Sequence, residues 1–405
     1  MHESATADNF GPLAGIRVLD LTTVISGPLT TMMLADQGAD VIKIEPPNGG
    51  DFGRHVATRR DGFSASFVNN NRNKRSVVLD LKSEEGISAL KVLAASADVF
   101  VQNFRPGVVE RLGIGPDVLR AINPELIYVS IAGFGFDGPL AHRPVYDPLI
   151  QAISALTTVQ AGSDDERPRL VRTILPDKLT GYQTAQAVTA ALFARERSGE
   201  GQEINVSMLD TVIGFLWSSD MNGHTFVGDE LEHEEAQSFI DLIYKVADGY
   251  VSVAVMHDKQ WHAFANAIDR ADLLNDPRFR TAELRELNRD ARLQAIQDAL
   301  THFTVDEVVG RMERADVPHA RVLTRTEMRQ HPQVAANGTL IEYDHPVAGR
   351  IRQARHAAVF SKTPTSVRRG APGLGEHTLE ILTEFGIESD QIDAIMSLTK
   401  KGASA

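Results

Sequence analysis

The sequence predicts an α/β fold in which helices cover both faces of a parallel sheet. Short apolar segments alternate with helical segments between residues 15 and 132, and turn-forming Gly, Pro and Ser residues separate them. At 405 residues the chain is long for a single hydrophobic core. A polar, acidic stretch over residues 221–237 divides the alternating region from a second region. We therefore expect at least two domains.

The alternating region predicts βαβ units in chain order. We expect strands at residues 16–21, 41–45, 76–81, 98–104 and 126–132, and helices at residues 29–37, 83–96 and 108–112. The first helix has Pro28 in its first turn, and Ser83 is placed to cap the second. The carboxyl ends of parallel strands are the usual ligand site of such folds.

Residues 174–210 combine a lone carboxylate, a helix, a Gly-containing turn and a short strand. Asp177 lies where the helix is expected to begin, and small apolar residues behind it predict a buried helix. Asp at the start of a helix is most often an N-cap, so the local sequence favours a structural role. The alternative is a reactive carboxylate whose ionised form the helix N-terminus stabilises.

The second region predicts a smaller α+β domain. Residues 239–246 and 250–256 flank Ala247-Asp248-Gly249, which is a hairpin signal. Helices are expected at residues 259–268, 288–301 and 305–315, then a hairpin at 339–343 and 350–352, and a terminal helix at 377–385. Thr304 and Glu307 form a capping-box pattern. The predicted organisation is a tail at 1–10, a large domain at 11–225, a small domain at 226–325, and a return to the large domain at 326–405.

Composition excludes several classes of function. A net charge of −13 argues against a general nucleic-acid binder. The absence of cysteine excludes disulfides, Cys-ligated zinc and a Cys nucleophile. No apolar run approaches the roughly 20 residues of a membrane helix, and MHESATADNF lacks the apolar core of a signal peptide. We expect a cytoplasmic protein that binds no membrane and no metal.

One nucleotide-binding motif is present without its context. Residues 133–138 match G-x-G-x-x-G after a predicted strand. A dinucleotide site also needs a helix that opens at this loop, whereas Pro139 and Pro144 follow it. We therefore do not expect NAD binding. A G-x-S-x-G motif is absent as well, which weakens a serine hydrolase interpretation.

Basic residues gather around two predicted strands. They are Arg72, Lys74, Arg75 and Lys82 around one strand, and Arg105 and Arg111 after the next. Beside the apolar Leu79 and the aromatic Phe104, this cluster could hold a phosphorylated, adenine-bearing ligand. Solvated surface cations are the alternative, and the residues alone leave both open.

Seven segments, in the same order, resemble those of the family III CoA-transferases. This family includes formyl-CoA and carnitine CoA-transferases and the related α-methylacyl-CoA racemase. The resemblance extends from about residue 11 to residue 386. The segments are residues 12–54, 73–82, 98–115, 122–139, 143–152, 198–210 and 374–382.

The resemblance implies roles for individual residues. Asp177 matches the catalytic carboxylate of the transferases. The positions that match CoA contacts, or that lie beside them, are Val24, Ile25, Leu79, Lys82, Asn103, Phe104, Arg105, Arg111 and Tyr146. The resemblance also implies a Rossmann-like large domain whose parallel sheet is built from both chain ends, an inserted small domain and an interlocked homodimer. CoA would enter as a thioester substrate, with no further cofactor.

Two departures bear on the reaction. The related racemases have Gly-His-Asp where this chain has Val145-Tyr146-Asp147, so one of two acid/base groups for proton exchange is missing. Ile25 replaces a polar residue of the formyl-CoA transferases, and their Gly-rich loop is not visible near residues 225–245. The first departure favours transfer over racemisation. The second argues against formyl-CoA and oxalate as the native pair.

We expect a CoA-transferase that moves CoA from an acyl-CoA to a free carboxylic acid through a covalent aspartyl intermediate on Asp177. One alternative is an acyl-CoA racemase or epimerase. Another is a non-catalytic protein that binds acyl-CoA. The residues do not identify the donor or the acceptor acid.

Overall fold

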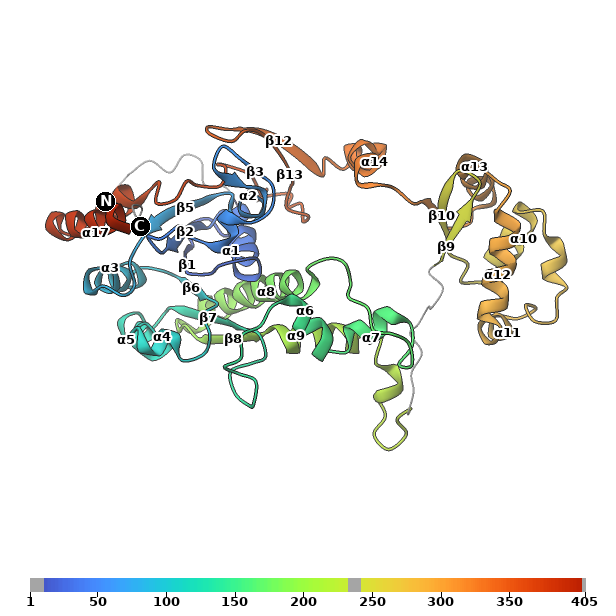
Figure 1. The fold of residues 1–405 in the computed structure, drawn as a ribbon, viewed down its shortest axis with the longest axis horizontal. Coiled ribbons are helices and arrows are strands. Elements are labelled where there is room, and N and C mark those ends of the chain that lie inside the picture. The colour runs from blue at the N-terminus through green and yellow to red at the C-terminus, as the bar shows by residue number, and fades with distance from the viewer. Residues whose placement is uncertain (1–10, 232–241, 403–405) are drawn as a thin grey trace. The chain divides into compact units, whose positions relative to one another are not determined.

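The computed structural model describes residues 11–231 and 242–402 (Figure 1). The chain divides into two units. Unit 1 contains Met1–Gln160, Pro168–Glu230 and Gly338–Ala405, and unit 2 contains Ala161–Arg167 and Leu231–Asn337. Most of unit 2 overlaps the small domain expected at residues 226–325. The boundaries of that domain remain a prediction. The expected tail, and part of the acidic run from Asp229 to Glu235, lie outside the described residues.

Unit 1 contains a six-stranded parallel sheet, as predicted. Its strands are β1 (Arg17–Asp20), β2 (Asp40–Glu45), β5 (Lys74–Val78), β6 (Val99–Gln102), β7 (Ile127–Ala132) and β8 (Glu203–Ser207). They lie in the order β5-β2-β1-β6-β7-β8. This is the doubly wound, Rossmann-like arrangement, and its order reverses between β1 and β6. The short strand that was expected after the Asp177 helix is β8.

The expectation that both chain ends build this sheet is wrong, because all six strands come from residues 17–207. The C-terminal segment instead covers the free edge of β5. The N–H of Ser76 donates to His377 Nδ1 at 3.2 Å, and the N–H of Val78 donates to Thr378 Oγ1 at 3.1 Å. The N–H of His377 donates to Ser76 O at 2.9 Å. Individual hydrogen bonds thus protect the edge without adding a strand.

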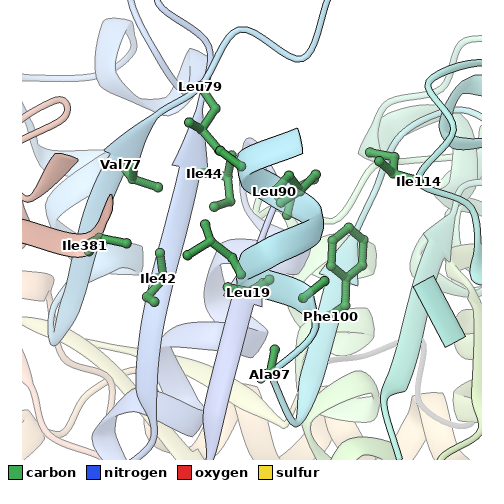
Figure 2. Packing of buried hydrophobic residues seen from close by; sticks show 14 of the residues in the cluster. Leu19, Ile42, Ile44, Val77, Leu79, Leu90, Ala97, Phe100, Ile114 and Ile381 are labelled. Atoms are coloured by element: carbon green, nitrogen blue, oxygen red, sulfur yellow. The ribbon is translucent and has the colours of Figure 1, made fainter. Parts of the chain in front are cut away.

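The sheet is apolar on both faces because successive side chains of a strand point to opposite sides. Leu19, Ile42 and Phe100 pack on one face, together with Leu90 and Ile381 from covering helices (Figure 2). The other face has its own core, which contains Val18, Val41, Val99, Val129, Leu34 and Val188. A buried parallel sheet requires such continuous apolar strands.

The helices of unit 1 form two layers. Helices α1 (Ser26–Asp36) and α8 (Leu175–Ser198) supply the core of one face, and α3 (Glu84–Ala94), α5 (Pro116–Ile122), α16 (Thr378–Glu384) and α17 (Ser389–Gly402) supply the other. The cap of α3 is confirmed, since Ser83 Oγ accepts the N–H of Gly86 at 3.0 Å. Helix α16 is not the terminal helix, because α17 follows it.

The remaining elements of unit 1 are shorter. They are η1 (Phe52–His55), β3 (Arg59–Arg60), β4 (Phe63–Ser64), α2 (Ala65–Asn71), α4 (Val108–Arg111), α6 (Asp147–Ile153), α7 (Leu156–Ala161), α9 (Met208–Trp217), η2 (Asn222–His224), β12 (Leu340–His345) and β13 (Gly349–Ala354). The hairpin β12–β13 confirms the prediction for that region. No helix of the described residues is long and apolar enough to cross a membrane.

Unit 2 has a three-stranded antiparallel sheet with helices around it. Its elements are β9 (Ile243–Val246), β10 (Gly249–Val253), α10 (Asp258–Ala267), η3 (Ala271–Leu274), α11 (Ala282–Leu287), α12 (Arg289–Leu300), α13 (Val305–Ala315), β11 (His319–Arg321), α14 (Arg325–Gln330) and α15 (Pro332–Ala336). The predicted hairpin and capping box are both confirmed. Trp261, Phe264 and Phe279 lie in its core.

A network of four buried charges lies under the first helix. Lys74 Nζ is 2.9 Å from Asp20 Oδ2, and Lys43 Nζ is 2.9 Å from Asp51 Oδ2. The side chains of Asp20, Lys43 and Lys74 are fully buried. Lys43 Nζ also donates to Thr22 O at 2.7 Å. Because burial strongly disfavours an unpaired charge, each member of this network requires the others.

The same pairing corrects the predicted phosphate-binding cluster. Arg72 is paired with Asp36 at 2.6 Å, and Arg75 is paired with Asp40 at 2.6 Å and with Glu384 at 2.5 Å. Arg72, Lys74 and Arg75 are therefore structural cations that compensate buried or half-buried carboxylates.

We predict that Asp20→Asn destabilises the protein by about 3–5 kcal/mol, because it leaves the buried charge of Lys74 without its carboxylate. Chemical denaturation followed by circular dichroism measures this change. Asp272→Asn is the control, since Asp272 forms an exposed pair with Arg270 and its loss should have no measurable effect. An Asp20→Asn protein as stable as the parent would contradict this role of the network.

Candidate active site

A cavity of about 300 Å³ lies at the carboxyl ends of β1, β6 and β7. This is where the strand order reverses, which is the usual ligand site of doubly wound sheets. Its walls are formed by Thr23, Val24, Ser26, Asn103, Phe104, Arg105, Pro106, Ile131, Ala132, Gly133, Ala141, Arg143, Pro144, Val145, Tyr146, Asp177 and Met208.

The loop between β1 and α1 is held in an uncommon conformation at this cavity. Val24 has φ +74°, which is an outlier for a β-branched residue. Its N–H donates to Asp51 Oδ1 at 3.0 Å. The neighbouring Thr23 exchanges two hydrogen bonds with the Asn103 side chain, at 3.0 and 2.9 Å. These contacts fix the loop so that Ser26, the first residue of α1, lines the cavity.

Asp177 is the third residue of α8, and it does not cap the helix. The N-cap is Ile174, whose side chain makes no capping hydrogen bond. The N–H of Asp177 instead donates to Asp147 Oδ2 at 3.3 Å. The N-cap interpretation of Asp177 is therefore wrong, because Asp177 is the third helical residue and Ile174 occupies the N-cap position. Helix α8 is also buried on one face only, with Ala190 exposed on the other.

Asp147 is itself held firmly. Gln151 Nε2 donates to Asp147 Oδ1 at 2.6 Å, and the N–H of Val171 donates to Gln151 Oε1 at 2.9 Å. Asp147 is buried, and burial raises its pKa above the ordinary value. Two carboxylates, of Asp147 and Asp177, are thus placed close together in a poorly hydrated position.

Ser26 and Asp177 line the same cavity, and the hydroxyl and N–H of Ser26 act to lower the pKa of the Asp177 carboxyl. Burial, and next the charge of Asp147, raise the pKa of Asp177 to about 6, against the opposing effect of Ser26. The expected stabilisation of the ionised form by the start of α8 is therefore outweighed. At neutral pH Asp177 is mostly ionised, yet it is more basic than an ordinary Asp, and this favours nucleophilic attack.

The structure brings most of the predicted site residues together around Asp177. Val24, Asn103, Phe104, Arg105 and Tyr146 all line the same cavity. Ile25 is the N-cap of α1. It lies in the chain between Val24 and Ser26, which both line the cavity, but it is not itself a lining residue. Leu79 is placed in the hydrophobic core and is 1% exposed, so the predicted ligand contact of its side chain is corrected (Figure 2).

Lys82 and Arg111 lie at a second cavity of unit 1, of about 760 Å³. Lys91 adds a third cation to its wall. The two cavities border a common apolar cluster. Phe104 lines the first cavity and packs on the core cluster, and Leu81 and Leu112 pack on the same cluster and line the second.

Sequence reasoning missed four residues of the site: Ser26, Arg143, Asp147 and Gln151. The Ser-Gly-Pro start of α1 was a signal for Ser26, since small polar residues open helices. Gly27 is required beside it, because a Cβ there would lie 2.2 Å from the Cβ of Thr22. The contact of Asp147 with Asp177 spans 30 residues and had no local signal.

Arg105 and Arg143 are both exposed guanidiniums at this cavity. Within residues 11–231 and 242–402, neither side chain makes a hydrogen bond or ion pair. The described residues also contain no group of three or more His, Asp or Glu side chains that could hold a metal ion.

Comparison with known proteins supplies the family. The model of CoA-transferase family III matches residues 13–378. The chain is 35% identical to acetyl-CoA:oxalate CoA-transferase of Acetobacter aceti, over 95% of this chain and 98% of that protein. It is 31% identical to human succinyl-CoA:glutarate CoA-transferase, over 93% of this chain and 86% of the human protein.

The fold is also similar to solved structures. A CAIB/BAIF family protein from Brucella suis superposes with a TM-score of 0.81 at 30% identity, over 93% of this chain and 100% of that chain. Together with the family match over nearly the whole sequence, these relatives establish the class of the enzyme. The chain is a CoA-transferase and belongs to CoA-transferase family III.

Proposed function

We propose that this enzyme transfers CoA from an acyl-CoA thioester to a free carboxylic acid, with Asp177 as the covalent nucleophile. The observation that carries the proposal is the place of Asp177. It lies in the cavity at the reversal of strand order, and its pKa is raised to about 6. No second nucleophilic carboxylate is among the residues that line this cavity.

The proposed reaction has four covalent steps. A carboxylate oxygen of Asp177 attacks the thioester carbonyl, which forms a mixed anhydride and releases CoA thiolate. The thiolate attacks the aspartyl carbonyl, which forms an aspartyl-CoA thioester and releases the first acid as a carboxylate. The acceptor carboxylate attacks this thioester and again forms an anhydride and CoA thiolate. The thiolate then attacks the acceptor carbonyl, which gives the new acyl-CoA and free Asp177. No net proton is consumed.

Ser26 is suited to two roles in these steps. Ser26 lies at the same cavity as Asp177, where its hydroxyl and N–H can orient the Asp177 carboxylate before attack. When thiolate or an acid attacks the aspartyl carbonyl, the same donors can stabilise the tetrahedral oxyanion, an effect typically worth a few kcal/mol. Positioning of the bound thioester against Asp177 supplies much of the remaining rate.

We assign CoA to the region between the two cavities of unit 1. Lys82, Lys91 and Arg111 provide cations for phosphate groups at the second cavity. Phe104 and Asn103 lie toward the first cavity, where the thioester would meet Asp177. The proposal of an interlocked homodimer rests on the family resemblance alone, and sedimentation analysis tests it.

The acceptor is best explained as a dicarboxylic acid. One carboxylate must reach Asp177, and the guanidinium of Arg143 or Arg105 is free to bind the other. The relatives support this, since they are named for glutarate, oxalate and D-citramalate. One relative that is 35% identical is named for oxalate, so oxalate belongs among the acceptors to be tested.

We predict that Asp177→Asn lowers CoA transfer by at least about 10³-fold, because the nucleophile is lost. Transfer is measured with succinyl-CoA as donor and a panel of carboxylic acids. Wild type that is incubated with donor and digested should yield a hydroxylamine-sensitive adduct on the peptide that contains Asp177. Asp210→Asn is the matched control, since Asp210 is likewise the third residue of a helix, is exposed and does not line the cavity.

Unchanged transfer by Asp177→Asn would refute the mechanism. Solvent deuterium that enters the α-position of the acyl group, with no acceptor acid present, would favour a racemase or epimerase.

The pH dependence should report the ionisation of Asp177. Because only the carboxylate is nucleophilic, kcat/KM should rise with pH through an apparent pKa of about 6 and then level off. Asp147→Asn keeps an oxygen for the N–H of Asp177 but removes a negative charge. The apparent pKa of kcat/KM should therefore fall from about 6 toward the ordinary Asp value of 3.8. It should not reach that value, because the effect of burial remains. An unchanged apparent pKa in Asp147→Asn would show that the charge of Asp147 does not raise the pKa of Asp177.

We predict that Arg143→Gln reduces discrimination between dicarboxylic and monocarboxylic acceptors. The ratio of kcat/KM for glutarate and for valerate should fall by at least about tenfold, since a charge-assisted hydrogen bond is lost. Transfer to valerate should persist, which separates loss of specificity from loss of catalysis. Arg105→Gln is compared in parallel, and an unchanged ratio in both variants would contradict this assignment of the acceptor.

A further inference from the structure

Unit 2 contains a cavity of its own, of about 480 Å³. This volume lies in the range of small-molecule sites, which are mostly apolar and have a few polar groups. One wall is apolar and is formed by Tyr244, Val253, Trp261, Phe264, Leu293 and Ile296. The polar side chains are Arg285, Glu286, Arg289 and Arg292, from α11 and α12. None of these residues belongs to the cavities of unit 1.

Positive charges outnumber negative charges among the residues that line this cavity. Arg285 is paired with Asp258 and also donates to Phe279 O at 3.1 Å. Arg289 is paired with Glu286. The closest carboxylate to Arg292 is this same Glu286, at 4.0 Å. Three guanidiniums thus line the cavity with one carboxylate, in a protein whose net charge is −13.

Arg292 is the cation that is least well compensated. Its side chain is only 15% exposed, and Nε is buried with no hydrogen-bond partner in the described part of the chain. The indole Nε1 of Trp261 is buried and unpartnered in the same way. Burial lowers the pKa of Arg292, and the neighbouring Arg285 and Arg289 act in the same direction against Glu286. A desolvated cation of this kind is costly without an anion.

We propose that the unit 2 cavity is a second ligand site, which binds an organic carboxylate with an aliphatic or aromatic body. The carboxylate pairs with the guanidinium of Arg292, whose planar donors match the two carboxylate oxygens. The body of the ligand lies along the apolar wall beside Trp261. An inorganic anion would leave that wall uncovered, and a neutral apolar ligand would leave Arg292 without a counter-charge. The site does not depend on Asp177.

Trp261 provides a local reporter for the test. The chain has two tryptophans, Trp217 and Trp261, so Trp217→Phe leaves Trp261 as the sole tryptophan. In the full-length Trp217→Phe protein, we expect octanoate to change the fluorescence of Trp261 in a saturable way. Octanamide, which has the same body without the charge, should bind at least about tenfold more weakly.

The next step is Arg292→Met in the Trp217→Phe background. This change should weaken octanoate binding by at least about tenfold and should leave the thermal midpoint unchanged or higher, because a poorly paired buried cation is removed. Arg270→Met is the matched control, since Arg270 is a paired arginine of unit 2 outside the cavity. Asp177→Ala should leave the fluorescence titration unchanged.

Three results would overturn the proposal. The first is the absence of any saturable change of Trp261 fluorescence up to about 10 mM octanoate. The second is equal binding of octanamide and octanoate. This comparison uses the Trp217→Phe protein alone, so it does not depend on the folding of the Arg292→Met variant. The third is loss of the signal in Asp177→Ala, which would assign it to the transfer site. None of them bears on CoA transfer, which the Asp177→Asn experiment tests separately.

Discussion

The close packing of α1 against α8 brings Ser26 and Asp177 to the same cavity, and the site depends on it. The two helices can approach because Gly181 faces α1, where a Cβ would lie 3.0 Å from Ser26 O. Thr30 Oγ1 donates across the same interface to Gly181 O at 3.1 Å. The buried charges fix α1 from below, since Thr31 Oγ1 donates to Asp20 Oδ2 at 2.7 Å and Lys74 Nζ donates to Pro28 O at 3.0 Å. Packing and buried ion pairs therefore determine where Asp177 meets its donors.

Burial has opposite consequences for the two groups of carboxylates in unit 1. Asp20 is fully buried, but Lys43 and Lys74 lower its pKa to about 2, so it stays charged and structural. In the described part of the chain no cation offsets burial at Asp177, and burial together with Asp147 raises its pKa to about 6. The difference lies in the partners and not in the depth of burial. The same low-dielectric interior thus stabilises one carboxylate and makes the other more basic.

The sequence was sufficient for features that depend on neighbouring residues. Apolar runs located the strands, and Thr304 with Glu307 located the start of α13. It was insufficient where the partner is distant. The sequence alone leaves Arg72 and Arg75 as candidates for phosphate binding, because their carboxylates, Asp36 and Asp40, are more than 30 residues away. The family resemblance placed Asp177 at the site, but its neighbour Asp147 required the folded chain.

The geometry around Asp177 favours group transfer over proton exchange. Exchange at an α-carbon requires one group to remove a proton on one side and another to return it on the other side. Among the described residues that line the cavity there is no histidine. Asp147 does not supply a second acid/base group to the cavity, because it is buried, does not line the cavity and accepts the N–H of Asp177. A single lining carboxylate with a raised pKa suits the nucleophilic role that we propose for Asp177 better than a two-base proton exchange.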